Sequence, residues 1–189
     1  INECDAYLIT GSRYSVYDEK EWIRKLENFV MKLHKIKCPL IGICFGHQIV
    51  ASALGGKTEL ASNGWGIGVQ NYEKMIVNSW LDPILENFSL LAIHQDQVTK
   101  LPKNAILVAK SDFCPNASFV VEKHILTFQA HPEFSKSYSK ALMILRKNII
   151  GAKTYNAGIK SLKKDVQSKI ITHWMLNFLY NAKKNQKST

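Results

Sequence analysis

The sequence predicts an α/β fold with a mostly parallel central sheet and a smaller antiparallel region. Residues 6–54 alternate between short apolar runs and helical segments, in an order typical of a parallel sheet covered by helices. Residues 66–128 instead contain several short apolar runs separated by turns, which favours hairpins. The chain has 189 residues, enough for one domain with a proper core.

The front of the chain predicts two strands and two helices. Residues 6–10 and 40–43 are apolar runs of strand length. Between them, large apolar side chains recur at helical spacing and charged residues fill the other face. These apolar residues are Trp22, Leu26, Phe29, Val30 and Leu33. Residues 49–54 predict a second helix, closed by the glycine pair 55–56.

The rest of the chain predicts further strands and two more helices. The strand candidates are residues 66–70, 74–77, 88–93, 105–109, 118–121 and 125–128. The second is expected to pair with the first, and the last two to form a hairpin. Helices are expected at 137–150 and at about 166–180, with a loop over 151–158. We therefore expect a single domain over residues 1–182 and a frayed tail over residues 183–189.

Composition excludes several classes of protein. No apolar stretch is long enough to cross a bilayer, and no signal peptide is recognisable. The four cysteines form no C-x-x-C pair, so zinc and dithiol redox sites have no support, and no metal is expected. Free thiols favour a reducing compartment, which we predict to be the cytoplasm. Because the first residue is Ile1 rather than Met, the natural beginning is expected to lie upstream.

The net charge of +10 raises the question of a nucleic-acid partner. However, the lysines are spread along the chain and cluster only at residues 163–164 and 183–187. No aromatic side chains are interleaved with these clusters to stack on bases. A solvated, lysine-rich surface is the favoured interpretation, and neither a nucleic-acid nor a membrane partner is expected.

Residues 38–50 contain the most informative motif. Cys44 lies between Gly42 and Gly46, where a short apolar strand meets a helix. This is the cysteine analogue of a strand–elbow–helix nucleophile motif, whose sharp turn requires glycines on both sides. The N-terminus of the following helix points toward the sulfur and favours the thiolate. Taken alone, the pattern is equally compatible with a buried structural cysteine.

The sequence His131-Pro132-Glu133 supplies a candidate base and a residue to orient it. In an extended segment, residues two apart point to the same side, so the imidazole and the carboxylate can be neighbours. The carboxylate would then fix the tautomer of the ring and stabilise its positive charge. In isolation, this tripeptide is more often a turn with two solvated polar groups.

Together, three segments resemble the signature blocks of the class I glutamine amidotransferases. They are residues 38–48, 94–98 and 129–134, in the family's order and with similar spacing. The resemblance extends from Asp5 to about Leu142 and is to the stand-alone branch related to the amidotransferase domain of GMP synthetase and to γ-glutamyl peptidases. It implies a three-layer, flavodoxin-like sandwich. Family members carry a further strand, helix and strand ahead of Asp5, which this sequence lacks.

The resemblance implies a Cys–His–Glu triad, with Cys44 as nucleophile, His131 as general base and acid, and Glu133 as the orienting carboxylate. It also implies an oxyanion hole built from backbone N–H groups. One is that of Phe45, and the others belong to the loop at Gly11 and Ser12. This loop usually reads Gly-Gly-Pro in synthetase-type members but continues here with Arg13.

Four further residues are implied to line the substrate pocket. Gln48 resembles the glutamine that holds the amino-acid end of the substrate, although a surface glutamine is the common alternative. His94, Gln95 and Asp96 match the loop that lines the pocket, and Asp96 is expected to meet the α-ammonium group. Without the resemblance, His94 would be interpreted as a strand-end histidine. Residues 64–68 resemble the border of the pocket, although Trp65 is equally suited to the core.

The first functional hypothesis is a stand-alone glutamine amidotransferase that releases ammonia through a γ-glutamyl thioester and passes it to a separate synthase subunit. The second is a γ-glutamyl peptidase with the same triad and a different leaving amine. The third is a binding protein on the same fold, which the intact triad argues against. No cofactor is expected for any of these, and no acceptor domain follows in the sequence.

Overall fold

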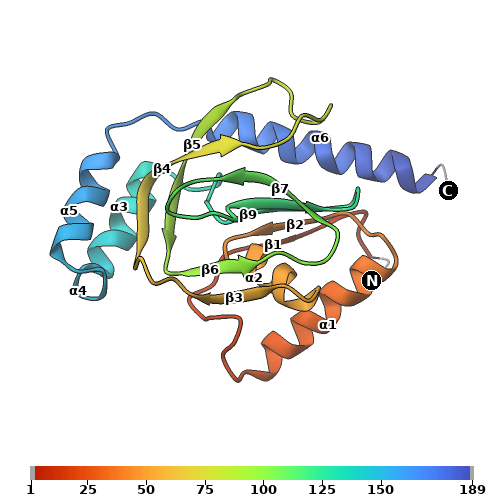
Figure 1. Cartoon of the computed structure of the whole chain (residues 1–189), viewed down its shortest axis with the longest axis horizontal. Coiled ribbons are helices and arrows are strands. Elements are labelled where there is room, and N and C mark those ends of the chain that lie inside the picture. The colour runs from red at the N-terminus through yellow and green to blue at the C-terminus, as the bar shows by residue number, and fades with distance from the viewer. Residues whose placement is uncertain (1–2, 188–189) are drawn as a thin grey trace.

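The computed structural model describes residues 3–187 of the chain. The strands of this part are β1 (Tyr7–Ile9), β2 (Leu40–Ile43), β3 (Lys57–Leu60), β4 (Gly66–Lys74), β5 (Asn87–His94), β6 (Asp96–Lys100), β7 (Ala105–Lys110), β8 (Ser118–Val121) and β9 (Ile125–Phe128). The helices are α1 (Glu21–Lys35), α2 (Phe45–Ala53), α3 (Lys136–Leu145), α4 (Lys147–Ile150), α5 (Ala152–Ser161) and α6 (Ser168–Lys187). Figure 1 shows their arrangement.

Seven strands form one mixed sheet in the order β1-β2-β9-β8-β7-β4-β5, and β3 and β6 form a separate antiparallel pair. Parallel pairing is confined to β1–β2 and β2–β9. The other four pairings in the large sheet are antiparallel. The large sheet therefore contains more antiparallel pairings than the sequence predicts for a mostly parallel sheet. Short connections such as the one between β8 and β9 allow only antiparallel neighbours, whereas α1 provides the long crossover that parallel strands need.

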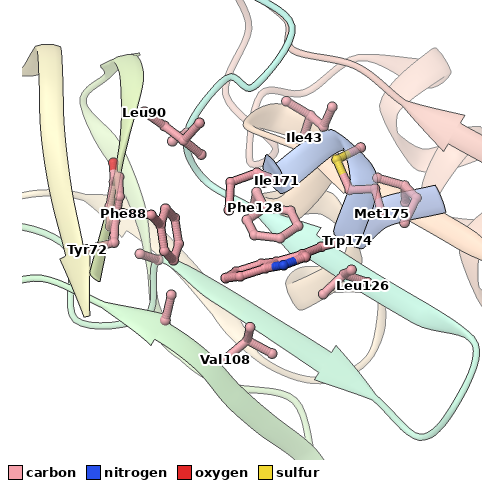
Figure 2. Close-up of a cluster of buried hydrophobic side chains, with 14 of the residues drawn as sticks. Ile43, Tyr72, Phe88, Leu90, Val108, Leu126, Phe128, Ile171, Trp174 and Met175 are labelled. Carbon is pink, nitrogen blue, oxygen red and sulfur yellow. The ribbon is translucent and has the colours of Figure 1, made fainter. Parts of the chain in front are cut away.

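Helices cover both faces of the sheet, which confirms the three-layer α/β architecture (Figure 1). On one face, α1 and α2 bury side chains such as Leu33 and Val50 against Leu40. On the other, α6 buries Trp174 among residues of β2, β5 and β9 (Figure 2). Adjacent strand residues alternate between these cores, as Leu40 and Ile41 do.

Helices α3, α4 and α5 pack at one end of the sheet, beside β4 and β5 (Figure 1). Two predictions are corrected here. The helix expected over residues 137–150 is interrupted at Arg146, which has a non-helical backbone and separates α3 from α4. The loop expected over residues 151–158 is largely helix α5, because Tyr155 and Ile159 pack against the apolar cluster of Ile67. Because Ile67 is distant in the sequence, the local pattern did not indicate this helix.

Other expectations also change at the ends of elements. Residues 74–77 do not pair with residues 66–70, because β4 continues to Lys74 and its hairpin partner is β5. The predicted tail is helical through Lys187, and Lys183 forms an ion pair with Asp5. Residues 188–189 lie outside the described part. None of the helices over residues 3–187 combines the length and the apolar character needed to cross a membrane.

The core against α6 predicts a large cost for removing Trp174. This side chain is completely buried, meets the ring of Phe88 edge-on, and donates a hydrogen bond from Nε1 to the carbonyl oxygen of Pro83. We expect Trp174→Ala to lower the free energy of unfolding by about 3–5 kcal/mol in urea denaturation. The matched control is Leu176→Ala on the same helix, where the side chain is 59% exposed. Equal losses in the two variants would contradict this assignment of the core.

Candidate active site

The site is built around the backbone of Cys44. This residue joins β2 to α2 with φ 53° and ψ −102°, a backbone conformation that residues other than glycine rarely adopt. Its N–H donates to the carbonyl oxygen of Phe128 at 2.8 Å, so β9 holds the turn from one side. The thiol is buried at the N-terminus of α2, where the unpaired N–H groups of the first turn favour negative charge.

Glycines on both sides of Cys44 allow this turn to close. A Cβ on Gly42 would lie 2.6 Å from the carbonyl oxygen of Gly46, which is backbone and cannot move aside cheaply. A Cβ on Gly46 would in turn collide with the carbonyl oxygen of Ile9 in β1. The sequence-based interpretation of a sharp turn with close chain approach is therefore confirmed.

His131 lies beside Cys44, on the segment that follows β9. Its N–H donates to the carbonyl oxygen of Leu91 at 2.8 Å, and its ring stacks on Phe134 with centroids 3.8 Å apart. Nδ1 donates to Oε1 of Glu133 at 2.7 Å. The buried Nε2 has no hydrogen-bond partner among the described residues. A proton on Nε2 is therefore free to be exchanged with a group that enters the site.

The charge state of His131 depends on its two neighbours. Burial by itself would lower the pKa of His131, because it penalises the cation. The nearby Cys44 sulfur and the hydrogen-bonded carboxylate of Glu133 outweigh burial and raise the pKa to about 9. At neutral pH, this arrangement favours an imidazolium between a carboxylate and a sulfur.

The loop after β1 passes directly over the Cys44–His131 pair. A Cβ on Gly11 would lie 3.0 Å from Cε1 of His131 and 3.7 Å from Cβ of Cys44. Within residues 3–187, the amide N–H groups of Gly11, Ser12 and Phe45 donate no backbone hydrogen bond. These three predicted oxyanion donors therefore come from the chain segments that adjoin the thiol.

A network of side chains on the other side of Cys44 connects the predicted substrate residues. The Nε2 group of Gln48 donates to the carbonyl oxygen of Asp96 and to Oε1 of Gln129, both at 3.0 Å. Nε2 of Gln129 then lies 3.6 Å from Sγ of Cys44 as a donor. His94 donates from Nδ1 to the same Asp96 carbonyl at 3.1 Å. Burial lowers the pKa of His94 to about 4, so this ring is neutral beside the cationic His131.

The carboxylate of Asp96 is fixed by two hydroxyl groups from the loop before α1. Oγ of Ser15 donates to Oδ2 at 2.5 Å, and the hydroxyl of Tyr17 donates to Oδ1 at 2.8 Å. Each carboxylate oxygen keeps a further lone pair. Gln95 lies between β5 and β6, and its carbonyl oxygen accepts from the N–H of Ala61. The result is an oriented negative group across the pocket from the thiol.

Two open cavities meet at Cys44. The first, called here the His131-side cavity, has a volume of about 320 Å³. It is lined by Thr10, Gly11, Ser12, Arg13, Cys44, Ile93, His131, Glu133, Phe134, Tyr138, Leu142 and Arg146. The second, the Gln48-side cavity, has a volume of about 490 Å³ and includes all four predicted substrate residues, together with Trp65. A substrate whose scissile bond lies at the thiol can thus extend into both cavities.

Several residues of the site were not predicted from the sequence. Gln129 precedes His131 by two positions, and the alternation that pairs His131 with Glu133 would also have placed Gln129 on that side. Ser15 and Tyr17 carry no local signal, because their partner Asp96 is distant in the sequence. Arg13 and Arg146 line both cavities and were likewise given no role. Among the described residues, no group of three or more His, Cys, Asp or Glu is arranged to hold a metal ion.

Comparison with known families gives one extended match. The family described as glutamine amidotransferase class-I matches residues 2–150. Gamma-glutamyl peptidase 2 of Arabidopsis thaliana is 36% identical over 141 residues, covering 72% of this chain and 56% of the relative. A GMP synthase [glutamine-hydrolyzing] of Clostridium acetobutylicum is 32% identical over 136 residues, covering 68% of this chain and 24% of that protein. The chain thus spans little more than half the length of the peptidase.

Solved structures agree with the fold. A crystal structure of a glutamine amidotransferase from Thermotoga maritima superposes with a TM-score of 0.71 at 23% identity. The superposition covers 92% of this chain and 76% of that one. Because identity is this low, the likeness supports the arrangement of the elements, and the chemistry rests on the side chains described above.

The ion pair of His131 predicts how its pKa responds to mutation. In Glu133→Gln, the imidazole loses its carboxylate partner, so we expect its pKa to fall from about 9 toward the ordinary value of 6.5. The measurement is an NMR titration of the histidine ring. The matched control is Glu73→Gln, which removes a half-exposed carboxylate that pairs with Lys110. It should leave the His131 titration unchanged.

The same shift links stability to pH. A raised pKa in the folded state stabilises the protein fully below about pH 6.5, and this contribution is lost as the pH rises through about 9. The wild type should therefore exceed Glu133→Gln in unfolding free energy near pH 6, where the carboxylate and the imidazole are both charged, and lose that advantage above pH 9. An advantage that grows with pH would show that His131 is not cationic in the folded protein.

Proposed function

Because the chain belongs to the class I glutamine amidotransferase family, we propose that it cleaves the amide bond of a γ-glutamyl compound through a covalent thioester on Cys44. The observation that carries this proposal is the arrangement of three side chains. The thiol lies at a strained turn beside an imidazole whose Nδ1 is held by a carboxylate at 2.7 Å. A nucleophile, a base and an orienting group in this order are what acyl transfer requires.

The proposed reaction has two halves. In the first, His131 holds the proton of the Cys44 thiol, and the thiolate attacks the γ-carbonyl carbon. The new S–C bond forms, the C–N bond breaks, and the amine leaves with the proton from His131. In the second half, a water molecule gives a proton to His131 and attacks the thioester, which releases the γ-carboxylate and restores the thiol.

Charge on the carbonyl oxygen needs stabilisation during both attacks. The N–H groups of Phe45, Gly11 and Ser12 are the proposed donors, because they adjoin the thiol and are not used by other backbone acceptors in the described chain. The amide of Gln129 donates toward the sulfur and is proposed to stabilise the thiolate. We also propose the cytoplasm as the compartment, because free thiols persist most readily where the environment is reducing.

Glutamine is the first proposed substrate, with ammonia as its leaving group. Its α-ammonium would meet the fixed carboxylate of Asp96, and Gln48 would hold the amino-acid end beside it. The GMP synthase relative is named as glutamine-hydrolyzing, which supports this substrate class. On this proposal, the ammonia passes to a separate synthase subunit.

A γ-glutamyl peptide is the second proposed substrate, and the shape of the site favours it. Ammonia needs no room beyond the scissile bond, yet a cavity of about 320 Å³ opens on the side of His131, where the leaving amine would be. The Arabidopsis relative is named a gamma-glutamyl peptidase. The two substrates share all the chemistry described here and differ only in the amine released.

The central prediction concerns Cys44. We expect Cys44→Ala to abolish amine release from both glutamine and a γ-glutamyl dipeptide, because no acyl-enzyme can form. Glu133→Gln should retain more activity than Cys44→Ala, since orientation is only part of the catalysis. Amine release by the full-length protein is the measurement, and mass spectrometry should detect a trapped γ-glutamyl adduct on Cys44.

The control for this experiment is Cys4→Ala, which removes an exposed free thiol outside the site. It should turn over both substrates like the wild type. Full activity in Cys44→Ala would exclude the thioester mechanism. Activity on glutamine alone would favour the amidotransferase, and activity on the dipeptide would favour the peptidase.

Gln129 gives a second test of the thiolate. In Gln129→Met, Sγ loses a hydrogen-bond donor at 3.6 Å, and a bond to a charged group contributes about 1.5–3 kcal/mol. We expect kcat/KM to fall by roughly ten- to a hundredfold. The control Gln70→Met removes an amide whose one side-chain hydrogen bond within residues 3–187 goes to the carbonyl oxygen of Ile67, and it should have no effect. An unchanged kcat/KM in Gln129→Met would remove Gln129 from the mechanism.

A further inference from the structure

Two of the chain's three arginines lie at the point where the two cavities meet. Arg13 belongs to the loop after β1, and Arg146 lies at the break between α3 and α4. Both side chains line the His131-side cavity and the Gln48-side cavity. The third arginine, Arg24, pairs with Glu27 on α1.

The excess of basic residues in the chain does not explain why arginines line the two cavities. The chain has 25 Lys and Arg residues, of which 22 are Lys. None of the described lysines lines either cavity, although lysines are about seven times as numerous as arginines. Arginine differs from lysine in its planar guanidinium, which grips a carboxylate with two parallel hydrogen bonds. The cavities thus hold the side chain suited to binding an anion.

Neither guanidinium is neutralised within the described chain. Arg13 donates to the hydroxyl of Tyr14 and lies over its ring, and Arg146 lies 6.0 Å from the ring centroid of Trp65. No ion pair is formed by Arg13 or Arg146 with a described carboxylate. The carboxylates that line the cavities are engaged elsewhere, Glu133 by His131 and Asp96 by two hydroxyls.

The chemistry of the proposed function decides which half of a substrate these arginines would meet. His131 gives its proton to the departing nitrogen, so the amine half lies in the His131-side cavity. The γ-glutamyl half then lies toward Gln48 and Asp96. The walls of the His131-side cavity combine the two guanidinium groups with Phe134, Tyr138 and Leu142. An amino acid or short peptide with a free carboxylate suits these walls, and ammonia uses none of them.

We propose that Arg13 and Arg146 bind the carboxylate of the leaving group and so select γ-glutamyl peptides over glutamine. The inference rests on the proposed thioester chemistry and names the substrate class for that site. Arg13 and Arg146 are specificity-determining residues in this proposal, and they take no part in bond breaking.

The test compares two substrates that differ in one group. γ-Glutamylglycine carries the leaving-group carboxylate, and γ-glutamylglycinamide replaces it with a neutral amide. In the full-length protein, we expect kcat/KM to be about ten- to a hundredfold higher for the acid. Arg146→Gln and Arg13→Gln should each reduce that ratio at least several-fold, and the double variant should bring it close to one. Arg146→Lys should restore only part of it, because lysine lacks the bidentate fork.

The control is Lys147→Gln, which removes one positive charge from the adjacent position. Lys147 lies over the ring of Tyr155 and lines neither cavity, so this variant should keep the wild-type ratio. A ratio near one in the wild type would overturn the proposal. So would equal losses on both substrates in the arginine variants, because the arginines would then bind the γ-glutamyl half. If Lys147→Gln lowered the acid-to-amide ratio as much as the arginine variants do, the ratio would reflect general surface charge, and the proposal would also be overturned.

A binding measurement separates this proposal from the proposed function. Calorimetry on Cys44→Ala needs no turnover and should show tighter binding of γ-glutamylglycine than of its amide. The double variant Arg13→Gln/Arg146→Gln in the Cys44→Ala background should lose that difference. If the wild type cleaves neither compound and does not hydrolyse glutamine, the thioester proposal fails, and the calorimetry still decides whether the arginines recognise the carboxylate. If both compounds are cleaved and bound equally, the thioester proposal stands and the arginine proposal fails.

Discussion

The backbone turn at Cys44 is the constraint on which the rest of the site depends. Its positive-φ conformation is held by the packing of β1, β2 and β9, which are adjacent and parallel. Parallel strands end at the same edge of a sheet, so these three deliver Gly11, Cys44 and His131 to one place. The close approach of Gly46 to Ile9 and the hydrogen bond from Cys44 to Phe128 tie the turn to both neighbours. A change in the order of these strands would separate all three groups.

The antiparallel half of the molecule supplies the opposite wall. Strand β5 ends at His94 and β6 begins at Asp96, so the bend between them lines the Gln48-side cavity that also reaches the thiol. The hydroxyls of Ser15 and Tyr17 reach that carboxylate from the loop before α1. The fixed carboxylate of Asp96 therefore lies on one side of the thiol, and the cavity beside His131 opens on the other, with Arg13 and Arg146 in the lining of both cavities. This asymmetry gives the site a direction along a bound substrate.

Two buried histidines near the thiol, His94 and His131, differ in charge because their surroundings differ. Burial lowers the pKa of His94 to about 4, and only a backbone carbonyl opposes this. The same burial acts on His131, but a thiol and a carboxylate reverse its effect and raise the pKa to about 9. The protein thus holds one neutral ring and one cationic ring in a single pocket, a separation typical of sites that move protons.

By itself, the sequence determined the β1–α1–β2–α2 order, the β8–β9 hairpin, the elbow at Cys44 and the proximity of His131 to Glu133. Each of these depends on residues a few positions apart, where periodicity and chain geometry act directly. The tertiary structure alone decided the pairing of β4 with β5, the helical state of residues 152–161, and the placement of Arg13 and Arg146 in the lining of the same two cavities. These features arise from contacts between distant segments, whose free energy outweighs local preference and leaves no local pattern.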